Sequence, residues 1–238
     1  MTDHERAAAE RPRELHLDQV SVEVDGHRIL DEVSVHLDQR RIAVIGPNGS
    51  GKSTFARLLD GLVTPTAGTV RVHGRDVVRE LKQVRAEVGF VFTNPDAQIL
   101  MPTVAEDVRL SLRGGGLTRA EIDARVASAL DDYGLLGHAD QPAYSLSGGQ
   151  KQLLALASVL VREPRLVIAD EPTTLLDLGN ARRIGRLLVD ELPMQTVIVT
   201  HDLELASRCD VALRFHGGRL TAVGEPAELV ARYREEFA

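Results

Sequence analysis

The chain has 238 residues, a formal net charge of −7 and one cysteine. Lys and Arg form no clustered run, so the sequence predicts no nucleic-acid partner, and a lone cysteine excludes a disulfide framework and metal sites built only from thiolates. No apolar run approaches the roughly 18 residues of a membrane-spanning helix, and the N-terminus lacks an apolar signal core. These features predict a cytosolic protein that would need a partner for any membrane association.

The first 37 residues predict a tail followed by a pair of strands. Residues 1–13 are polar and charged without apolar periodicity, which predicts a disordered tail ahead of one domain spanning 14–238. From Leu15 to Leu37 the apolar residues alternate on both sides of Asp25-Gly26, a pattern typical of antiparallel strands joined by a tight turn. An antiparallel β layer therefore precedes the next motif.

A glycine-rich loop lies between a predicted strand and a predicted helix. Ile42–Ile45 is an unbroken apolar run, typical of a strand buried on both faces, and apolar residues recur at helical spacing after the loop. The loop fits the phosphate-binding pattern GxxxxGK[ST] at every fixed position, with Gly46, Pro47, Asn48, Gly49, Ser50, Gly51, Lys52, Ser53 and Thr54. We expect Lys52 to reach the terminal phosphates of a triphosphate and Ser53 to ligate Mg²⁺. The alternative is a tight turn that happens to contain glycines.

Three short elements follow this helix. Gly68–Gly74 alternates apolar and polar residues, Val77–Val84 is amphipathic at helical spacing, and Val88–Phe92 is an apolar strand pattern. The last strand stops at Thr93–Asp96, where Pro95 forces a turn.

A mostly helical stretch comes next. Capping-box patterns at Thr103/Glu106 and Thr118/Glu121 predict two helix starts, and apolar residues from Ile122 to Tyr133 form the stripe of the second helix. We expect a helical subdomain over about residues 95–160, inserted between two sheet-forming regions.

In the last part of the chain, strands alternate with helices. Leu166–Ala169 and Thr196–Thr200 are wholly apolar or β-branched strands with a helix between them, Val211–Val223 predicts a hairpin, and Pro226–Phe237 a closing helix. Such strands imply a parallel sheet that is covered on both faces. The predicted fold class is therefore α/β, with an antiparallel β layer and an inserted helical subdomain.

Polar residues follow two of these strands. Asp170 and Glu171 come directly after Leu166–Ala169, and His201 follows Thr200. Because ligands of parallel α/β sheets bind beyond the carboxyl ends of the strands, we expect Asp170 to hold Mg²⁺, Glu171 to polarise the attacking water and His201 to contact the terminal phosphate. Each residue alone could be a helix cap or a solvated loop residue. Together with the glycine-rich loop they predict transfer of a phosphoryl group from ATP to water.

A second helix start that could face an anion lies at Ser147-Gly148-Gly149-Gln150. Ser147 can cap the helix and Gln150 can close a capping box, so a well-formed helix start is one interpretation. The two glycines weaken a helix but leave backbone N–H groups open to an anion. One nucleotide bound by one chain would not need a second phosphate-facing element in so small a domain. The second element therefore indicates that two chains face each other across the nucleotide.

The motifs GPNGSGKST, LSGGQ, LVIADEP and TVIVTHD, in this order, resemble those of the ATPase subunits of ATP-binding-cassette (ABC) transporters, and the resemblance runs from about Leu15 to the C-terminus. It implies ATP and Mg²⁺ as cofactors and a head-to-tail dimer with a second ATPase subunit, identical or different. Loop 46–54 of one subunit and residues Ser147, Gly148, Gly149 and Gln150 of the other would enclose each ATP. The resemblance also implies Glu171 as the catalytic base, His201 as a switch and Asp177 in a dimer-contact loop.

Within this family, segments 94–98 and 102–108 are similar to those of the energy-coupling-factor (ECF) importers. These importers pair cytosolic ATPases with a transmembrane coupling protein and a membrane substrate-binding protein. The run DEPTTLLDL at 170–178 looks most like that of the biotin importers. The resemblance implies a peripheral protein at the cytoplasmic face of the cell membrane that energises vitamin uptake. The rival interpretation is a soluble single-cassette ABC ATPase that assists cofactor (iron–sulfur) assembly.

Three positions depart from the family pattern. Thr93 stands where the family usually has a Gln that touches Mg²⁺ or the attacking water; because Thr is shorter, a water would have to bridge its hydroxyl. Val24 stands near the usual place of the aromatic residue that stacks on adenine, so we expect only an apolar contact with the base. Leu153 stands where Arg is usual, and the sequence offers no physical account of that change.

Three consecutive apolar residues, Ile99, Leu100 and Met101, lie in a predicted loop. Solvent exposure of all three would be unfavourable without a partner. They are therefore either a docking patch for a membrane protein or part of the core of the helical subdomain.

Overall fold

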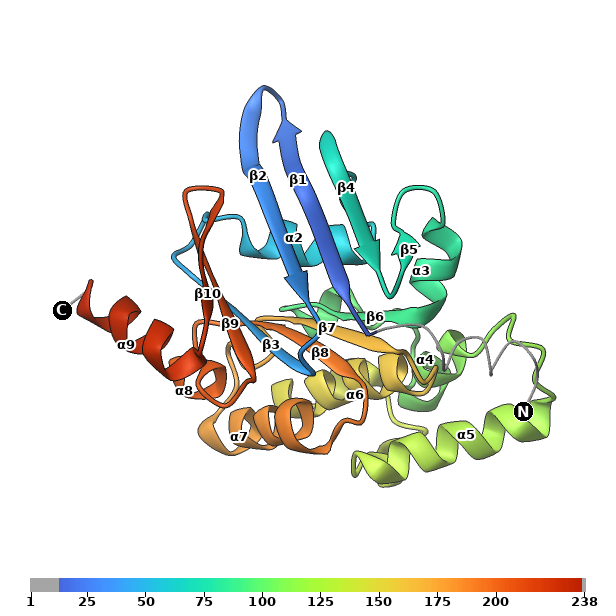
Figure 1. Cartoon of the computed structure of the whole chain (residues 1–238). Coiled ribbons are helices and arrows are strands. Elements are labelled where there is room, and N and C mark those ends of the chain that lie inside the picture. Colours follow the sequence, from blue (N-terminus) through green and yellow to red (C-terminus); the bar gives the residue numbers. More distant parts are fainter. Residues whose placement is uncertain (1–12, 237–238) are drawn as a thin grey trace.

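The computed structural model describes residues 13–236, which fold around two β sheets (Figure 1). The tail expected at 1–13 lies, apart from Arg13, outside the described residues. The first sheet is antiparallel in the order β2-β1-β4-β5 and consists of β1 (Leu15–Val24), β2 (His27–Leu37), β4 (Ala67–Val72) and β5 (Arg75–Asp76). Asp25 and Gly26 join β1 to β2 with positive φ angles of 50° and 75°, which confirms the predicted tight turn.

The second sheet is mostly parallel and has the strand order β10-β9-β3-β8-β7-β6. Its strands are β3 (Arg41–Ile45), β6 (Val88–Val91), β7 (Leu166–Asp170), β8 (Gln195–Val199), β9 (Val211–His216) and β10 (Arg219–Gly224). Only β10, at one edge, pairs antiparallel with its neighbour. Every residue of β3, β6, β7 and β8 is buried, which explains why the sequence shows unbroken apolar runs there rather than alternation.

The two faces of this parallel sheet pack against different layers. Ala43 and Ile45 belong to a core shared with the helices, whereas Ile42 and Val44 belong to a second core shared with the antiparallel sheet. Helix α2 (Lys52–Leu59) belongs to the second core, contacts strands of both sheets and lies behind the antiparallel sheet in Figure 1. One face of the parallel sheet is thus covered by helices and the other by α2 and the antiparallel sheet.

The helices of the first core come from the middle and the end of the chain. They are α4 (Val104–Ser111), α5 (Arg119–Asp132), α6 (Gly148–Leu160), α7 (Leu178–Arg186), its π-helical continuation η4 (Leu187–Glu191), α8 (Leu203–Ala206) and α9 (Pro226–Glu235). Short 3-10 turns are η1 (Pro95–Ala97), η2 (Leu136–His138) and η3 (Ala143–Ser145). Both predicted capping boxes, at Thr103/Glu106 and Thr118/Glu121, are fully formed, so these helices begin where the sequence predicts.

The prediction of a helix over Val77–Val84 is wrong in its position. Helix α3 spans Leu81–Glu87 instead. The carboxylate of Asp76 accepts hydrogen bonds from the backbone N–H groups of Val78 and Arg79, both at 3.0 Å. This side chain holds the preceding residues in a turn, so the helix starts four residues later.

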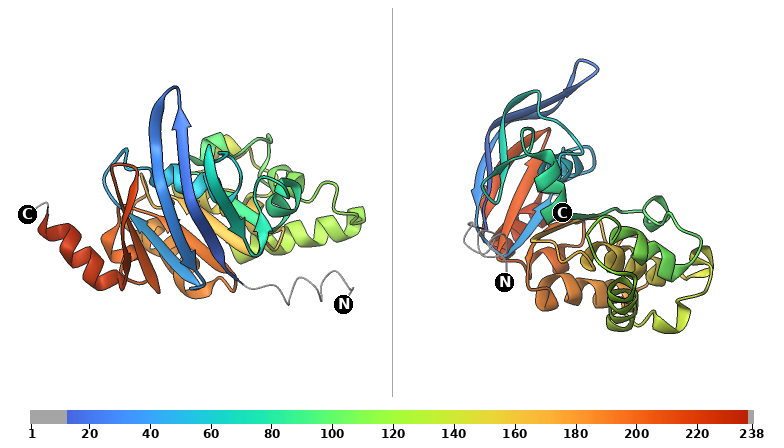
Figure 2. Two further views of the ribbon diagram at one scale, coloured as in Figure 1. Left: turned by 45° about the horizontal axis from the view of Figure 1, so that its top comes forward. Right: turned by 90° about the vertical axis from the view of Figure 1, so that its right-hand side faces the viewer.

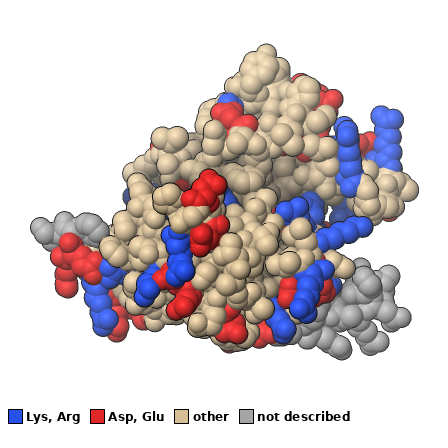
Figure 3. All heavy atoms as spheres, turned by 90° about the horizontal axis from the view of Figure 1, so that it is seen from above, with Lys and Arg blue, Asp and Glu red and all other residues tan. Residues whose placement is uncertain are grey.

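Acidic and basic side chains are interspersed on the face of the molecule shown in Figure 3. Large apolar side chains that are exposed include Leu100, Tyr144, Leu175 and Leu178. Within residues 13–236, no helix combines the length and the apolar character that crossing a bilayer requires.

Candidate nucleotide-binding site

The glycine-rich loop between β3 and α2 is shaped by close approaches of its neighbours. Gly46 has a φ of 145°, and a Cβ there would lie 2.2 Å from the carbonyl oxygen of Phe215 in β9. Gly51 has a φ of 101°, and a Cβ there would lie 2.6 Å from Cδ2 of Leu30 in β2. Any other residue at these two positions would displace the loop, because strands of both sheets touch it.

The loop folds around the ammonium group of Lys52, and the residue as a whole is 6% exposed. Lys52 Nζ donates hydrogen bonds to the carbonyl oxygens of Gly46, at 2.8 Å, and Pro47, at 2.9 Å. Burial lowers the pKa of Lys52, while the carboxylates of Glu171 and Asp170 oppose this shift. The N-cap residue of α2, Gly51, makes no side-chain cap, so the first N–H groups of the helix are open to an anion beside this cation.

Asp170 ends β7 next to the first turn of α2. Its Oδ1 accepts a hydrogen bond of 3.0 Å from Ser53 Oγ, and its carbonyl oxygen accepts one of 2.9 Å from Thr93 Oγ1. Burial raises the pKa of Asp170, although the hydrogen bond from Ser53 lowers it. A cation beside this carboxylate would offset the desolvation of its charged form.

The oxygen atoms of Ser53 and Asp170 fit Mg²⁺, which prefers hard oxygen ligands. No cluster of three or more His, Cys, Asp or Glu suited to a metal ion occurs within residues 13–236. The remaining ligands would therefore come from phosphate oxygens and water, as is usual for Mg²⁺ bound with a nucleotide.

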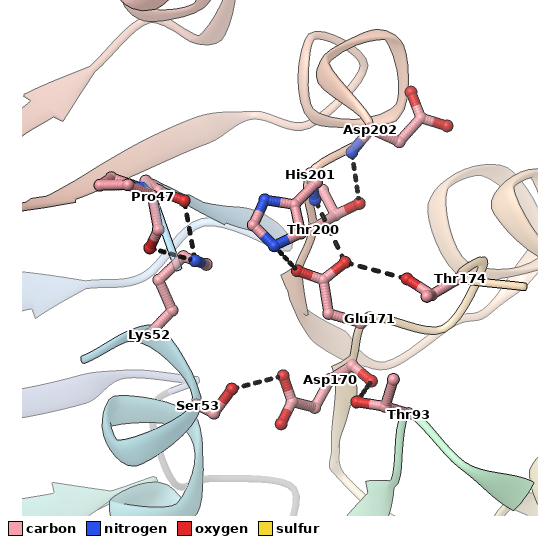
Figure 4. A network of polar contacts seen from close by, with 11 residues as sticks. Pro47, Lys52, Ser53, Thr93, Asp170, Glu171, Thr174, Thr200, His201 and Asp202 are labelled. Atoms are coloured by element: carbon pink, nitrogen blue, oxygen red, sulfur yellow. Dashed lines mark hydrogen bonds and ion pairs between the residues drawn. The ribbon is translucent and has the colours of Figure 1, made fainter. Parts of the chain in front are cut away.

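Glu171 lies beside Asp170 and is connected to His201 in the segment that follows β8 (Figure 4). Its Oε2 accepts hydrogen bonds from the backbone N–H of His201 at 3.2 Å and from Thr174 Oγ1 at 3.3 Å. Its Oε1 lies 3.0 Å from His201 Nε2, close enough for an ion pair with a protonated imidazole but not aligned as a hydrogen bond. Burial raises the pKa of Glu171, and His201 opposes the shift. Glu171 has a φ of 53°, in the left-handed region that residues other than glycine rarely adopt, and Glu163 shares this feature with a φ of 55°.

The other predicted elements form a second cluster. Ser147 and Gln150 complete the predicted capping box at the start of α6. Asp177 caps α7, and its carboxylate accepts hydrogen bonds from Asn180 N at 3.0 Å and Asn180 Nδ2 at 2.5 Å. A Cβ at Gly149 would lie 2.3 Å from Cγ of Asn180, so Asn180 joins the start of α6 to Asp177. Gly149 is thus needed for packing, whereas a Cβ at Gly148 would meet no atom within 4 Å.

Val24 lies at the end of the β1–β2 hairpin and is 52% exposed. It is not part of the polar network of Figure 4. Within the glycine-rich loop, Asn48 and Gly49 are exposed, and Thr54 is half-buried in the first turn of α2.

Sequence reasoning missed Thr174, Asn180 and Asp107. Asp107, 4% exposed, accepts hydrogen bonds from the backbone N–H groups of Leu100 at 2.8 Å and Met101 at 3.1 Å and from Ser158 Oγ at 2.9 Å. It ties the loop that follows Thr93 to α6. Acidic residues are common in the first turn of a helix, so the sequence does not single out Asp107. Its burial and its hydrogen bonds reveal that it links the loop to α6.

The model of the ABC transporter family matches residues 30–174. The chain belongs to this family. It is 47% identical over 87% of its length to the biotin transport ATP-binding protein BioM of Rhizobium etli, covering 91% of that protein. It is 40% identical over 82% of its length to the energy-coupling factor transporter ATP-binding protein EcfA1 of Lacticaseibacillus paracasei, covering 71% of it. The solved structure of cbiO1 from Clostridium perfringens, part of the ABC transporter complex cbiONQ, superimposes with a TM-score of 0.82 at 32% identity, covering 93% of this chain and 92% of that one.

As an ABC ATPase, the chain is an ATP-hydrolysing subunit of a transporter, and the α/β fold class predicted from the sequence is confirmed. Two departures from the family pattern gain a physical description. The hydroxyl of Thr93 is bonded to the backbone of Asp170 rather than to a catalytic carboxylate. Leu153 is 3% exposed in the helical core, where an unpaired Arg would be unfavourable.

Proposed function

We propose that this ABC ATPase drives an ECF-type importer that takes up a vitamin, biotin, through transmembrane partners, by ATP-driven closure of a dimer. The observation that carries the catalytic part is the network of Figure 4, in which Lys52, Ser53 and Asp170 lie beside the Glu171–His201 pair. This set joins a phosphate-binding cation, Mg²⁺ ligands and a carboxylate base, which hydrolysis of a triphosphate requires.

Each side chain has a distinct role in this proposal. Lys52 would exchange its two carbonyl acceptors for oxygen atoms of the terminal phosphates, since its charge is already desolvated at the loop. Glu171 would orient and deprotonate the attacking water, and its raised pKa suits a general base. His201 holds Glu171 through its backbone N–H, and its imidazole, which is 47% exposed and lies 3.0 Å from Glu171 Oε1, would turn from this carboxylate to meet the terminal phosphate.

Mg²⁺ held by Ser53 and Asp170 would neutralise the charge that develops on the phosphates. The hydrogen bond between Ser53 and Asp170 keeps these two oxygen donors together. Thr93, which follows the adjacent strand β6, donates a hydrogen bond to the backbone carbonyl of Asp170. A movement of Asp170 would therefore be transmitted to the segment after β6.

The second cluster supports a dimer. Ser147 and Gln150 bond to each other, and Gln150 also bonds to His138, so the hydrogen bonds of this helix start stay within its own cluster. The N–H groups of its glycines would serve a nucleotide held by the partner subunit. The exposed residues Leu175 and Leu178, which flank Asp177, give this surface the apolar character that a subunit contact needs.

A transmembrane partner would dock next to Leu100. Ile99 packs against the helical core, whereas Leu100 is 72% exposed and Tyr144 is 80% exposed. Together with Met101 they line a cavity of about 380 Å³. Asp107 holds this loop rigid, so a helix of the coupling protein seated there would be linked through the loop to Thr93 and the nucleotide. In this proposal the half-buried Ile99 packs against the helical core, and the exposed Leu100 is the docking residue.

The biotin assignment is supported by the similarity to BioM and by the DEPTTLLDL run at 170–178. Isolation of the chain from membranes and identification of the proteins that copurify tests it. A membrane coupling protein and a biotin-binding membrane protein are expected. Recovery from the cytosol with iron–sulfur proteins would favour the soluble alternative.

Replacing Glu171 by Gln tests the catalytic part. The amide keeps the shape of the side chain but cannot accept a proton, so we expect ATP hydrolysis to fall at least about a hundredfold while ATP binding is kept. ATP should also trap this variant as a dimer, which gel filtration measures. Glu163→Gln is the matched control, since Glu163 is an exposed glutamate with a similar φ of 55°. Near-normal ATP turnover by Glu171→Gln would show that Glu171 is not the catalytic base.

A further inference from the structure

The side chain of Gln150 has hydrogen-bond partners on both sides of its amide. Its Oε1 accepts a bond of 2.9 Å from the backbone N–H of Ser147, and its Nε2 lies 3.1 Å from Nε2 of His138. A backbone N–H can only donate, so the atom of Gln150 that faces Ser147 is the oxygen and the one that faces His138 is the nitrogen. The amide therefore donates a hydrogen bond to the histidine ring.

These contacts determine where the ring of His138 carries its hydrogen. Because the Gln150 amide donates, Nε2 of His138 accepts and carries no hydrogen. The hydrogen of a neutral imidazole then lies on Nδ1, which is 2.8 Å from Oε1 of Gln141, an acceptor. Only the neutral ring with its hydrogen on Nδ1 satisfies both bonds. A protonated ring would carry hydrogens on both nitrogens and turn a second donor toward the Gln150 amide.

His138 approaches Gln150 from a different segment, the turn η2, which lies between α5 and α6 in the chain and contacts α5. Helices α4, α5 and α6 lie together to one side of the two sheets, at the lower right of the right-hand view of Figure 2. Two backbone bonds of 2.9 Å hold the turn, one from His138 N to Leu135 O and one from Gln141 N to His138 O. The half-buried His138 therefore braces the Gln150 side chain from outside α6.

The charged side chains on the elements around this ring are those of Asp131 and Asp132 in α5, Asp140 after η2 and Lys151 in α6. The three acidic side chains are exposed, so solvent screens their charges, and Lys151 forms an ion pair of 2.7 Å with Asp96. The hydrogen bonds of the ring go to the neutral amides of Gln141 and Gln150 instead. A change in the charge of His138 thus acts first on the Gln150 amide.

We propose that His138 is a positioning residue for Gln150, and that only its neutral form holds this side chain in place where the helix start meets the nucleotide of the partner subunit. The inference rests on the dimer of the proposed function. With the neutral ring, Gln150 is ordered before the partner arrives, so its ordering does not oppose closure. Once the ring is protonated, the bond from Gln150 is lost and two donors face each other, so the side chain has to leave its place. ATP-driven dimerisation should therefore weaken as the pH falls through the range in which histidine titrates, about pH 5–8.

Dimerisation of the full chain carrying Glu171→Gln, measured with ATP by sedimentation at pH 8 and pH 6, tests this inference. Adding His138→Ala removes the acceptor and should raise the dimer dissociation constant about threefold or more at pH 8, as expected for one modest hydrogen bond. Adding His138→Gln supplies an acceptor oxygen that does not titrate. This variant should dimerise like the parent chain at pH 8 and about threefold or more tighter than the parent at pH 6.

The matched control is His36→Gln, the same change at an exposed histidine of the antiparallel sheet, which should leave the pH dependence of the parent unchanged. Nitrogen NMR of the chain without nucleotide at pH 8 reads the tautomer separately. The ring signals that disappear in His138→Gln should show the hydrogen on Nδ1. A hydrogen on Nε2, or an equal pH dependence of the parent and His138→Gln, would overturn the role of His138 while the dimer stands. If the parent does not dimerise with ATP at either pH, the proposed dimer is refuted and the role of His138 with it.

Discussion

Replacing Gly149 by Ala should destabilise the protein because Asn180 occupies the space that a methyl group needs. The added Cβ would lie 2.3 Å from Cγ, 2.4 Å from Nδ2 and 2.7 Å from Oδ1 of Asn180. The amide cannot simply swing away, since its Nδ2 is bonded to the carboxylate of Asp177 at 2.5 Å. The substitution therefore separates α6 from α7 or breaks the contact with Asp177.

The expected size follows from two opposing effects. Forcing a methyl group into a packed contact costs about 1–3 kcal/mol, whereas Gly to Ala within a helix gains about 0.5–1 kcal/mol. The net loss of unfolding free energy for Gly149→Ala is therefore at most about 2.5 kcal/mol. The neighbouring Gly148→Ala adds a methyl group with no atom within 4 Å and should keep only the gain. Because the gain is common to both variants, they should differ by the cost of the packed contact alone, about 1–3 kcal/mol in the free energy of unfolding.

Urea denaturation followed by circular dichroism measures this difference. Introducing Gly149→Ala into an Asn180→Ala background removes the clash, so most of the loss should disappear in that double-mutant cycle. Equal stabilities of the two alanine variants, or an undiminished loss without Asn180, would refute the packing argument.

Three further results are expected. Burial raises the pKa of Asp60 to about 6. Between about pH 4 and 6 Asp60 is therefore protonated in the folded state but ionised in the unfolded state, and the protein loses up to about 3 kcal/mol of stability as the pH rises through that window. Asp60→Asn should raise the melting temperature more at pH 8 than at pH 5, and an equal shift at both pH values would contradict this. Leu100→Ser should reduce membrane association without changing the urea midpoint, whereas Ile99→Ser should lower the stability by about 1–2 kcal/mol. If instead Leu100→Ser lowers the stability and leaves membrane association unchanged, the docking surface lies elsewhere. Thr93→Gln should change the stimulation of ATP hydrolysis by the membrane partner more than the basal rate, because the Thr93 hydroxyl donates to the backbone carbonyl of Asp170 rather than to a catalytic carboxylate. A larger effect on the basal rate would show that this loop acts on catalysis itself.

Local signals in the sequence were sufficient for most of the elements, though not for the position of α3, and for grouping the residues at the centre of the candidate site. The capping boxes at Thr103 and Thr118 involve residues three apart, so their pattern is complete within one helical turn. The apolar runs of β3, β7 and β8 predict strands buried on both faces, and the residues that follow such strands must meet at one edge of a parallel sheet. For this reason Lys52, Ser53, Asp170, Glu171 and His201 could be grouped before their distances were known.

Tertiary structure decided the features that depend on register and on close packing between distant segments. Val24 and His27 face the same way because β1 and β2 pair as they do, with a bulge just before them, and a shift of one residue would separate them. Gly149 is required by a side chain thirty-one positions away, and Asp107 bonds backbone groups of a loop and a serine on another helix. These contacts leave no mark in the local sequence pattern, because their energies arise only when two elements are packed at van der Waals distance.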